Sequence, residues 1–196
     1  GVLDFRLLAI SVICFYFVIK HLLMRLIFLG PMNPIPTLSD SNYSKNEYQR
    51  DGCNIVYYTN FQNKFSDLVI FIHGWESASS RFEHRMKLFR QNGFHTLTFD
   101  MRGHGESGAT SEWTAGKVIE DLKGILNEID SKIVRNTHFY GHSLGGFITL
   151  GMQNERHGGW WKDRIGTIML ESPMTGYSPV LKDLSGKLSF LYPLLR

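Results

Sequence analysis

Gly-His-Ser-Leu-Gly, residues 141–145, follows the apolar run 137–140 and precedes a second glycine and an apolar segment, 146–150. Between a strand and a helix this pentapeptide makes a turn so tight that only glycine fits beside the serine, whose side chain then points away from the backbone. The pattern therefore predicts that Ser143 is a nucleophile at an exposed turn. The alternative, a glycine turn without a chemical role, is disfavoured by the apolar runs on both sides.

Two backbone N–H groups are candidates for stabilising negative charge near this serine. Leu144 begins the expected helix, whose free N–H groups and positive dipole end face the place where an oxyanion would form. An apolar run also ends in His73-Gly74-Trp75, which places flexible backbone at the sheet edge where ligands bind in open α/β folds. We expect the N–H groups of Trp75 and Leu144 to form an oxyanion hole, and His73 to hold the loop in place.

The composition is that of one globular domain. The chain has 196 residues, of which 43% are hydrophobic and 20% charged, enough for a single core. The net charge of +3 is too small to imply a nucleic-acid partner, and no basic stripe interleaved with aromatics occurs. Cys14 and Cys53 are the only cysteines, and their settings indicate neither a disulfide framework nor a zinc site.

Short apolar runs alternate with helical patterns from about residue 51 onwards, which predicts an α/β fold with a doubly wound, mostly parallel sheet covered on both faces. The expected strands are 54–59, 68–72, 95–99, 137–140 and 166–170. The expected helices are 81–91 and 114–130.

The segment 7–29 is apolar apart from Lys20, His21 and Arg25. At 1.5 Å per residue it could cross a bilayer core of about 30 Å, so we expect a transmembrane helix that anchors the chain in a membrane, with its orientation open. A cleaved signal peptide is a second possibility, but the small-residue cleavage pattern is missing. A buried or interfacial helix is the third, because the uninterrupted run 7–19 has only 13 residues.

The predicted organisation has four parts. Residues 1–30 form the membrane anchor, and 31–50, rich in Pro, Asn and Ser, form a linker. The catalytic core spans 51–175. Apolar residues at helical spacing in 176–196 would begin a lid over the site, or an amphipathic helix packed on the sheet.

Three motifs in order resemble the α/β-hydrolase family: His-Gly-Trp at 73–75 after a strand, Phe-Asp-Met-Arg-Gly-His-Gly at 99–105, and the pentapeptide at 141–145. Within the family the chain is similar to the lysophospholipase, monoacylglycerol-lipase and serine-aminopeptidase-like branch, over about 54–175. The resemblance implies hydrolysis of a small-molecule ester, thioester or amide through an acyl-serine intermediate, with no metal or organic cofactor.

The catalytic partners of the serine are the point of departure from this family, in which the order is serine, acid, histidine. After Ser143 the only histidine is His157, with Glu155 between them. On a continuous helix His157 would lie about 21 Å from the serine, so it is not the base. Glu171 is a better-placed acid but lacks a histidine. The expectation is a chain that stops before its catalytic histidine.

The motif at 99–105 is expected to be structural. Its glycines and a pairing of Asp100 with Arg102 fit a turn better than proton transfer, so His104 is left out of the mechanism.

The favoured function is a membrane-anchored serine hydrolase of carboxylic esters with lipid-like, acylglycerol or lysophospholipid substrates. Trp75, Phe147 and Tyr177 supply apolar surroundings that fit an acyl chain. Acyl transfer or thioester cleavage with the same serine is a second reading. The third is a hydrolase-fold binding protein without catalysis.

Overall fold

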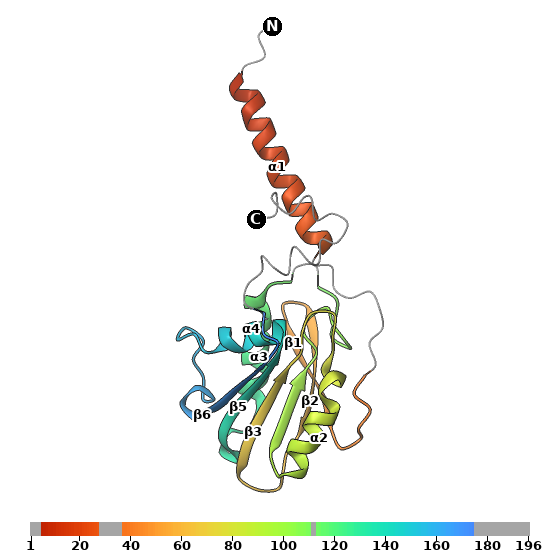
Figure 1. Cartoon of the computed structure of the whole chain (residues 1–196), viewed down its shortest axis with the longest axis vertical. Helices are drawn as coiled ribbons and strands as arrows, with labels where there is room; N and C mark the ends of the chain where they lie inside the picture. Colours follow the sequence, from red (N-terminus) through yellow and green to blue (C-terminus); the bar gives the residue numbers. More distant parts are fainter. Residues whose placement is uncertain (1–4, 28–36, 111–112, 175–196) are drawn as a thin grey trace. The chain divides into compact units, whose positions relative to one another are not determined.

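The computed structural model describes residues 5–27, 37–110 and 113–174, with side chains from residue 7 to 23 in the first range. The chain divides into two units. One contains the N-terminal helix α1 (Phe5–Ile27), and the other, residues 30–175, is an α/β unit (Figure 1).

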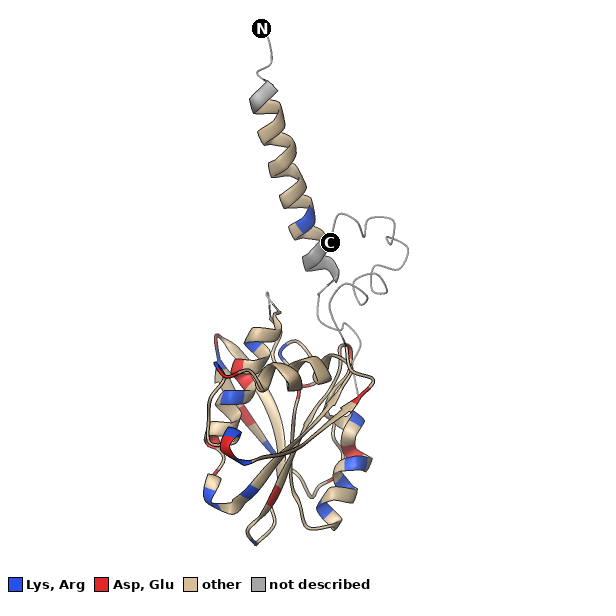
Figure 2. Ribbon diagram, turned by 60° about the vertical axis from the view of Figure 1, so that its left-hand side comes forward, with Lys and Arg blue, Asp and Glu red and all other residues tan. Residues whose placement is uncertain are grey.

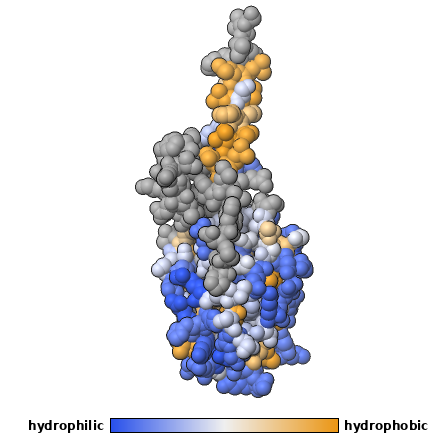
Figure 3. Space-filling view, turned by 90° about the vertical axis from the view of Figure 1, so that its right-hand side faces the viewer, coloured by the Kyte–Doolittle hydropathy of each residue, from blue (hydrophilic) through white to orange (hydrophobic). Residues whose placement is uncertain are grey.

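Helix α1 carries apolar side chains on every side. Lys20 is the only Lys, Arg, Asp or Glu among its described side chains, 7–23 (Figure 2), and this part of the helix is strongly hydrophobic (Figure 3). Its exposed large side chains are Leu7, Leu8, Ile10, Val12, Ile13, Phe15, Tyr16, Phe17, Val18 and Leu22.

Within the described residues no helix is both long enough and apolar enough to cross a membrane. The transmembrane helix predicted for 7–29 is therefore not supported. The uncharged run 7–19 has 13 residues, whereas a span takes about 20.

The α/β unit is built on a six-stranded sheet in the order β1-β2-β4-β3-β5-β6. Strands β4, β3, β5 and β6 run parallel, whereas β1 pairs antiparallel with β2 and β2 with β4. The mostly parallel α/β class is thus confirmed. The strands are β1 (Ser44–Arg50), β2 (Cys53–Asn60), β3 (Ser66–Ile72), β4 (His95–Phe99), β5 (Val134–His142) and β6 (Ile165–Glu171).

The predicted linker 31–50 is wrong for its last seven residues, which form β1. The strand was missed because its polar sequence, Ser-Lys-Asn-Glu-Tyr-Gln-Arg, lacks the apolar alternation of a half-buried strand. Pairing with β2 and packing on α3 create it, and the side chain just before it, Tyr43, belongs to the core.

Helices cover the sheet on both faces: α2 lies on one, α3 and α4 on the other (Figure 1). The predicted helix 81–91 is split into the 3-10 turn η1 and α2, and the predicted helix 114–130 appears as α3, capped by the Thr114 hydroxyl. The helical elements are η1 (Ser79–Phe82), α2 (Glu83–Gln91), α3 (Ala115–Glu128), η2 (Ser131–Ile133), α4 (Leu144–Met152) and η3 (Lys162–Arg164).

The central strand β3 is buried on both faces. Its residues from Leu68 to Ile72 have no solvent exposure, as expected for a strand between two helical layers. Phe71 packs against Phe82 of η1 and Tyr140 of β5, which fixes the α2 layer on the sheet.

The two edge strands of the described sheet differ in character. β1 carries Lys45, Glu47 and Arg50, which suit an edge that faces water. β6 has no charge before Glu171, and Leu170 in it is 38% exposed. Within the described residues, one edge of the sheet is thus a charged strand and the other an apolar one.

A buried ion pair joins the loop after β4 to α3. Arg102 donates from Nε and Nη2 to the two carboxylate oxygens of Asp121 at 2.8 and 2.6 Å, and both side chains are almost fully buried. Arg50 of β1 adds a third contact at 3.2 Å. The Asp121 carboxylate thus ties β1, α3 and the loop after β4 together.

We expect Asp121→Asn to lower the free energy of unfolding by about 3–5 kcal/mol, because it leaves the Arg102 charge buried without a counter-ion. Urea denaturation followed by tryptophan fluorescence measures this. The matched control is Glu120→Gln on the same helix, whose partly exposed pair with Lys123 should contribute at most about 1 kcal/mol. Equal losses for the two variants would contradict the prediction.

Candidate active site

Ser143 lies between the end of β5 and the first residue of α4, with φ 52° and ψ −117°. This left-handed backbone is rare for a residue with a side chain, and such strain persists where surrounding structure fixes it, often at functional sites. The serine is half-buried and its side chain makes no capping hydrogen bond to α4. The predicted strand-serine-helix turn is therefore present, and the hydroxyl is not used to hold the helix.

Two glycines of the pentapeptide are required by close backbone packing. A Cβ on Gly145 would clash with the carbonyl oxygens of Ile72 and His73, at the end of β3. A Cβ on Gly141 would lie 2.5 Å from both the Gly145 carbonyl oxygen and the Thr149 hydroxyl. The first turn of α4 thus sits directly on two strands, and this contact sets the position of the serine.

The end of β6, the segment after it and the first turn of α4 all hydrogen-bond to the serine backbone. The Ser143 N–H donates to the Glu171 carbonyl at 3.0 Å, and the Ser143 carbonyl accepts from the N–H groups of Gly146 at 2.9 Å and Met174 at 3.0 Å. Three hydrogen bonds therefore fix the strained residue.

The loop after β3 comes to the same place. A Cβ on Gly74 would lie 3.1 Å from the Ser143 Cβ, so the Gly74 backbone approaches the serine without a side chain between them. Trp75 follows, and its ring lies edge-on to the rings of His104 and Trp113 at centroid distances of 4.8 and 5.1 Å. The structure thus places the loop that carries Trp75 next to Ser143, and Leu144 follows the serine as the first residue of α4.

His73 is fully buried beneath this loop. Its Nδ1 lies 2.7 Å from the Gly74 carbonyl oxygen, and its Nε2 accepts from the Met101 N–H at 3.0 Å. Burial, the main cause, lowers its pKa to about 4. It is therefore neutral at pH 7 and both ring nitrogens are engaged, as expected for a histidine that holds a loop.

A polar cluster on the α2 side of the serine was missed in the sequence. Arg81 donates from Nη2 to Nε2 of His142 at 2.8 Å, next to the serine. Burial and the Arg81 charge lower the pKa of His142. Glu171 accepts from Arg85 at 2.8 Å and from the Tyr140 hydroxyl at 3.1 Å. No sequence signal predicts these pairs, because their partners are 31 to 86 residues apart.

The expected pairing of Asp100 with Arg102 is wrong. Asp100 accepts instead from the N–H groups of Ser79 at 2.7 Å and Glu106 at 2.8 Å, while Arg102 turns to α3. Burial, the main cause, raises the pKa of Asp100. The motif is nevertheless a turn, since a Cβ on Gly105, at φ 52°, would clash with the Asp100 carboxylate.

His157 lies beyond α4, which ends at Met152, and not on the helix that the distance argument assumed. Its Nδ1 is 3.3 Å from Glu120 of α3, and its Nε2 accepts from Arg156 at 3.1 Å. It is engaged with α3 beyond the end of α4 opposite to Ser143.

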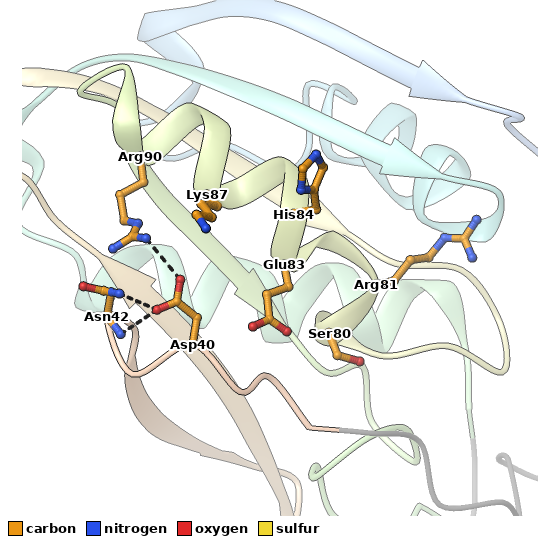
Figure 4. A pocket seen from close by; sticks show the side chains of 8 residues that line it. All are labelled: Asp40, Asn42, Ser80, Arg81, Glu83, His84, Lys87 and Arg90. Carbon is orange, nitrogen blue, oxygen red and sulfur yellow. Dashed lines mark hydrogen bonds and ion pairs between the residues drawn. The ribbon is translucent and has the colours of Figure 1, made fainter.

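A surface pocket of about 720 Å³ lies along the outer side of α2 (Figure 4). Its acids are already hydrogen-bonded: Asp40 to Arg90 and Asn42, and Glu83 to the Ser39 hydroxyl. Ser143 is not among the lining residues, which are Asp40, Asn42, Ser80, Arg81, Glu83, His84, Lys87 and Arg90. The pocket therefore does not open onto the serine itself, although Arg81, the partner of His142, lines it.

The chain matches the family model described as serine aminopeptidase, S33, over residues 63–196. The matched segment includes the loop after β3, the turn after β4 and the serine turn.

Among curated proteins the chain is 29% identical to protein phosphatase methylesterase 1 of Candida albicans over 111 residues, which are 56% of this chain and 31% of that protein. It is 28% identical to the bifunctional esterase/perhydrolase of Acinetobacter calcoaceticus over 97 residues, 50% of this chain and 34% of that protein. The chain thus spans about a third of the length of these relatives.

Solved structures share the fold. An esterase of Pyrococcus furiosus superimposes with a TM-score of 0.63 at 19% identity, covering 85% of this chain and 65% of that one. Est1E of Butyrivibrio proteoclasticus, solved with ferulic acid, gives 0.58 at 24% identity and covers 70% and 56%. With the family match over more than half its length, the chain belongs to the serine aminopeptidase (S33) family of α/β hydrolases.

Proposed function

We propose that this chain carries the nucleophile and the oxyanion hole of a serine hydrolase that cleaves carboxylic esters. The observation that supports this most directly is the left-handed Ser143 between β5 and α4, with the Gly74 backbone against it. The Ser143 oxygen attacks the ester carbonyl, and the N–H groups of Trp75 and Leu144 stabilise the resulting oxyanion. A general base takes the proton of the Ser143 hydroxyl and gives it to the alcohol, which leaves; water, deprotonated by the same base, then releases the acid from the acyl-serine and restores the hydroxyl.

The proposed substrates are lipid-like esters such as acylglycerols or lysophospholipids. The aromatic side chains of Trp75 and Trp113 beside the loop offer an apolar wall for an acyl chain. Tyr177, expected to contribute as well, lies outside the described residues, as does the proposed lid 176–196. The names of the relatives, a methylesterase and an esterase/perhydrolase, favour ester chemistry over amide cleavage.

Two other functions use the same geometry. In an acyltransferase or thioesterase, Ser143 would act in the same way and only the acyl donor or acceptor would differ. A hydrolase-fold binding protein would bind an acyl ligand beside Ser143 without turnover. The strain at Ser143 favours a catalytic serine over this last possibility.

The general base is proposed to come from residues outside the described part of the chain. Two histidines close to the serine site are already engaged, the partly exposed His142 by Arg81 and the buried His73 by Gly74 and Met101. His157 contacts α3 instead.

In the full-length protein, we expect a fluorophosphonate probe to label Ser143, and Ser143→Ala to abolish the labelling. Labelled protein is quantified by gel fluorescence and the site by peptide mass spectrometry. The control is Ser172→Ala, since Ser172 also has a positive φ, 45°, near the site but no strand-to-helix turn. Labelling that survives Ser143→Ala would remove this serine from the mechanism.

The 196-residue chain should show no more than trace esterase activity. A serine without its base loses about 10⁴-fold or more in rate, and only the oxyanion hole and binding remain. The measurement is hydrolysis of p-nitrophenyl acetate by the chain and by its Ser143→Ala variant. Turnover typical of an esterase that is lost in the variant would show that a base lies within this chain.

Localisation at a membrane is a separate proposal, supported by the apolar side chains that α1 exposes on every side. The proposal is that α1 attaches the chain to a membrane surface, not that it crosses the membrane. The chain should sediment with membranes at high speed and be released by detergent, whereas the variant Ile10→Gln/Phe15→Gln/Val18→Gln should shift toward the supernatant. Wild-type chain that stays in the supernatant without detergent would contradict the proposal.

A further inference from the structure

The hydrogen bonds of His73 define which of its ring nitrogens carries the proton. A carbonyl oxygen can only accept, so Nδ1 donates to the Gly74 carbonyl at 2.7 Å. A backbone N–H can only donate, so Nε2 is bare where it accepts from Met101 at 3.0 Å. The ring is a fixed bridge between the loop after β3 and the loop after β4.

The Gly74 carbonyl belongs to the same peptide group as the Trp75 N–H. The described chain has no cis peptide bond, and in a trans peptide the C=O and the N–H point in opposite directions. A carbonyl held toward the His73 ring therefore forces the Trp75 N–H to face away from it. The orientation of one proposed oxyanion donor is thus coupled to a side chain that is fully buried.

The loop needs such a restraint. Glu76, the residue after Trp75, has φ 51°, and a non-glycine residue in that region is costly. Gly74, without a Cβ, can rotate more readily than any other residue. The side chain of His73 is fully buried and packs against His104 at a centroid distance of 5.4 Å, so the ring itself cannot follow a rotating peptide.

We propose that His73 is a positioning residue of the esterase site: through its Nδ1–H bond to the Gly74 carbonyl it holds the Trp75 N–H toward the Ser143 turn, and through Nε2 it ties this orientation to Met101. This rests on the proposed function for its catalytic consequence, but the hydrogen-bonding role stands without it.

The test uses two amides of different length in place of the imidazole. The Asn side-chain NH₂ falls near the position of Nδ1 and can still donate to the Gly74 carbonyl. The Gln amide reaches the position of Nε2 and can serve Met101 only. We therefore expect His73→Asn to label with fluorophosphonate within about threefold of the wild-type rate. His73→Gln and His73→Leu should be slower by about 10²-fold, the typical loss for one oxyanion donor.

The rates are measured on full-length protein that retains a cooperative thermal transition. The matched control is His95→Leu, because His95 is also fully buried and bridges two segments, Gln62 and Ile133, far from the serine in the fold. This variant should lose stability while its folded fraction labels at the wild-type rate. Equal rates for the Asn and Gln variants, or wild-type labelling of His73→Leu, would overturn the proposal.

Nitrogen-15 NMR of the wild-type 196-residue chain in detergent separates this proposal from the proposed function. At pH 7 we expect His73 protonated at Nδ1 and unprotonated at Nε2. An Nε2-protonated ring overturns the positioning role whatever the labelling shows. If the wild-type protein fails to label, the ester-hydrolase function is contradicted, and the tautomer alone then decides the hydrogen-bonding role of His73.

Discussion

The site depends on backbone segments that meet with no side chain between them. The first turn of α4 touches the end of β3 at Gly145, and the loop after β3 touches the serine at Gly74. A side chain at Gly145 would push the helix off the strands, and a side chain at Gly74 would press against the serine. Because protein interiors are close-packed, this contact determines where Ser143 stands, which loop faces it and which N–H groups can reach a bound carbonyl oxygen.

Buried polar groups around the serine divide into those that carry chemistry and those that hold shape. Asp100, His73 and Arg102 are nearly inaccessible to solvent, and each has hydrogen-bond partners in a neighbouring loop or helix. An unpaired buried group of this kind would be costly, so paired groups specify one loop arrangement. Ser143 differs, since its side chain is left out of the capping interactions of its own helix. This contrast distinguishes the proposed reacting group, the Ser143 hydroxyl, from the buried polar side chains that fix the loops around it.

Much of this arrangement could be predicted from the sequence because it is encoded locally. The strand-serine-helix order around Ser143, the strand before His73 and the capped helix after Thr114 all follow from apolar period and turn chemistry within short windows. The family resemblance was also readable from three motifs. These features agree with the structure because local preference and tertiary packing favour the same conformation there.

The features that escaped prediction are set by distant partners. β1 is polar along its length and becomes a strand only by pairing with β2 in the register from Ser44 with Thr59 to Arg50 with Cys53. Arg102 was assigned to the acid two residues before it, but its counter-ion is Asp121 on α3. Likewise, Arg81 reaches His142 across 61 residues. A single sequence offers no local signal for such pairs.

The unequal edges of the sheet have a consequence for handling the protein. A row of unpaired backbone N–H and C=O groups on an uncharged strand is a template for another strand. β6 is such a strand within the described sheet, whereas the charges of β1 discourage pairing on the other side. Among the described strands, β6 is therefore the edge at which a further strand, from the same chain or from another molecule, would add, and the edge to block if the sample associates on concentration.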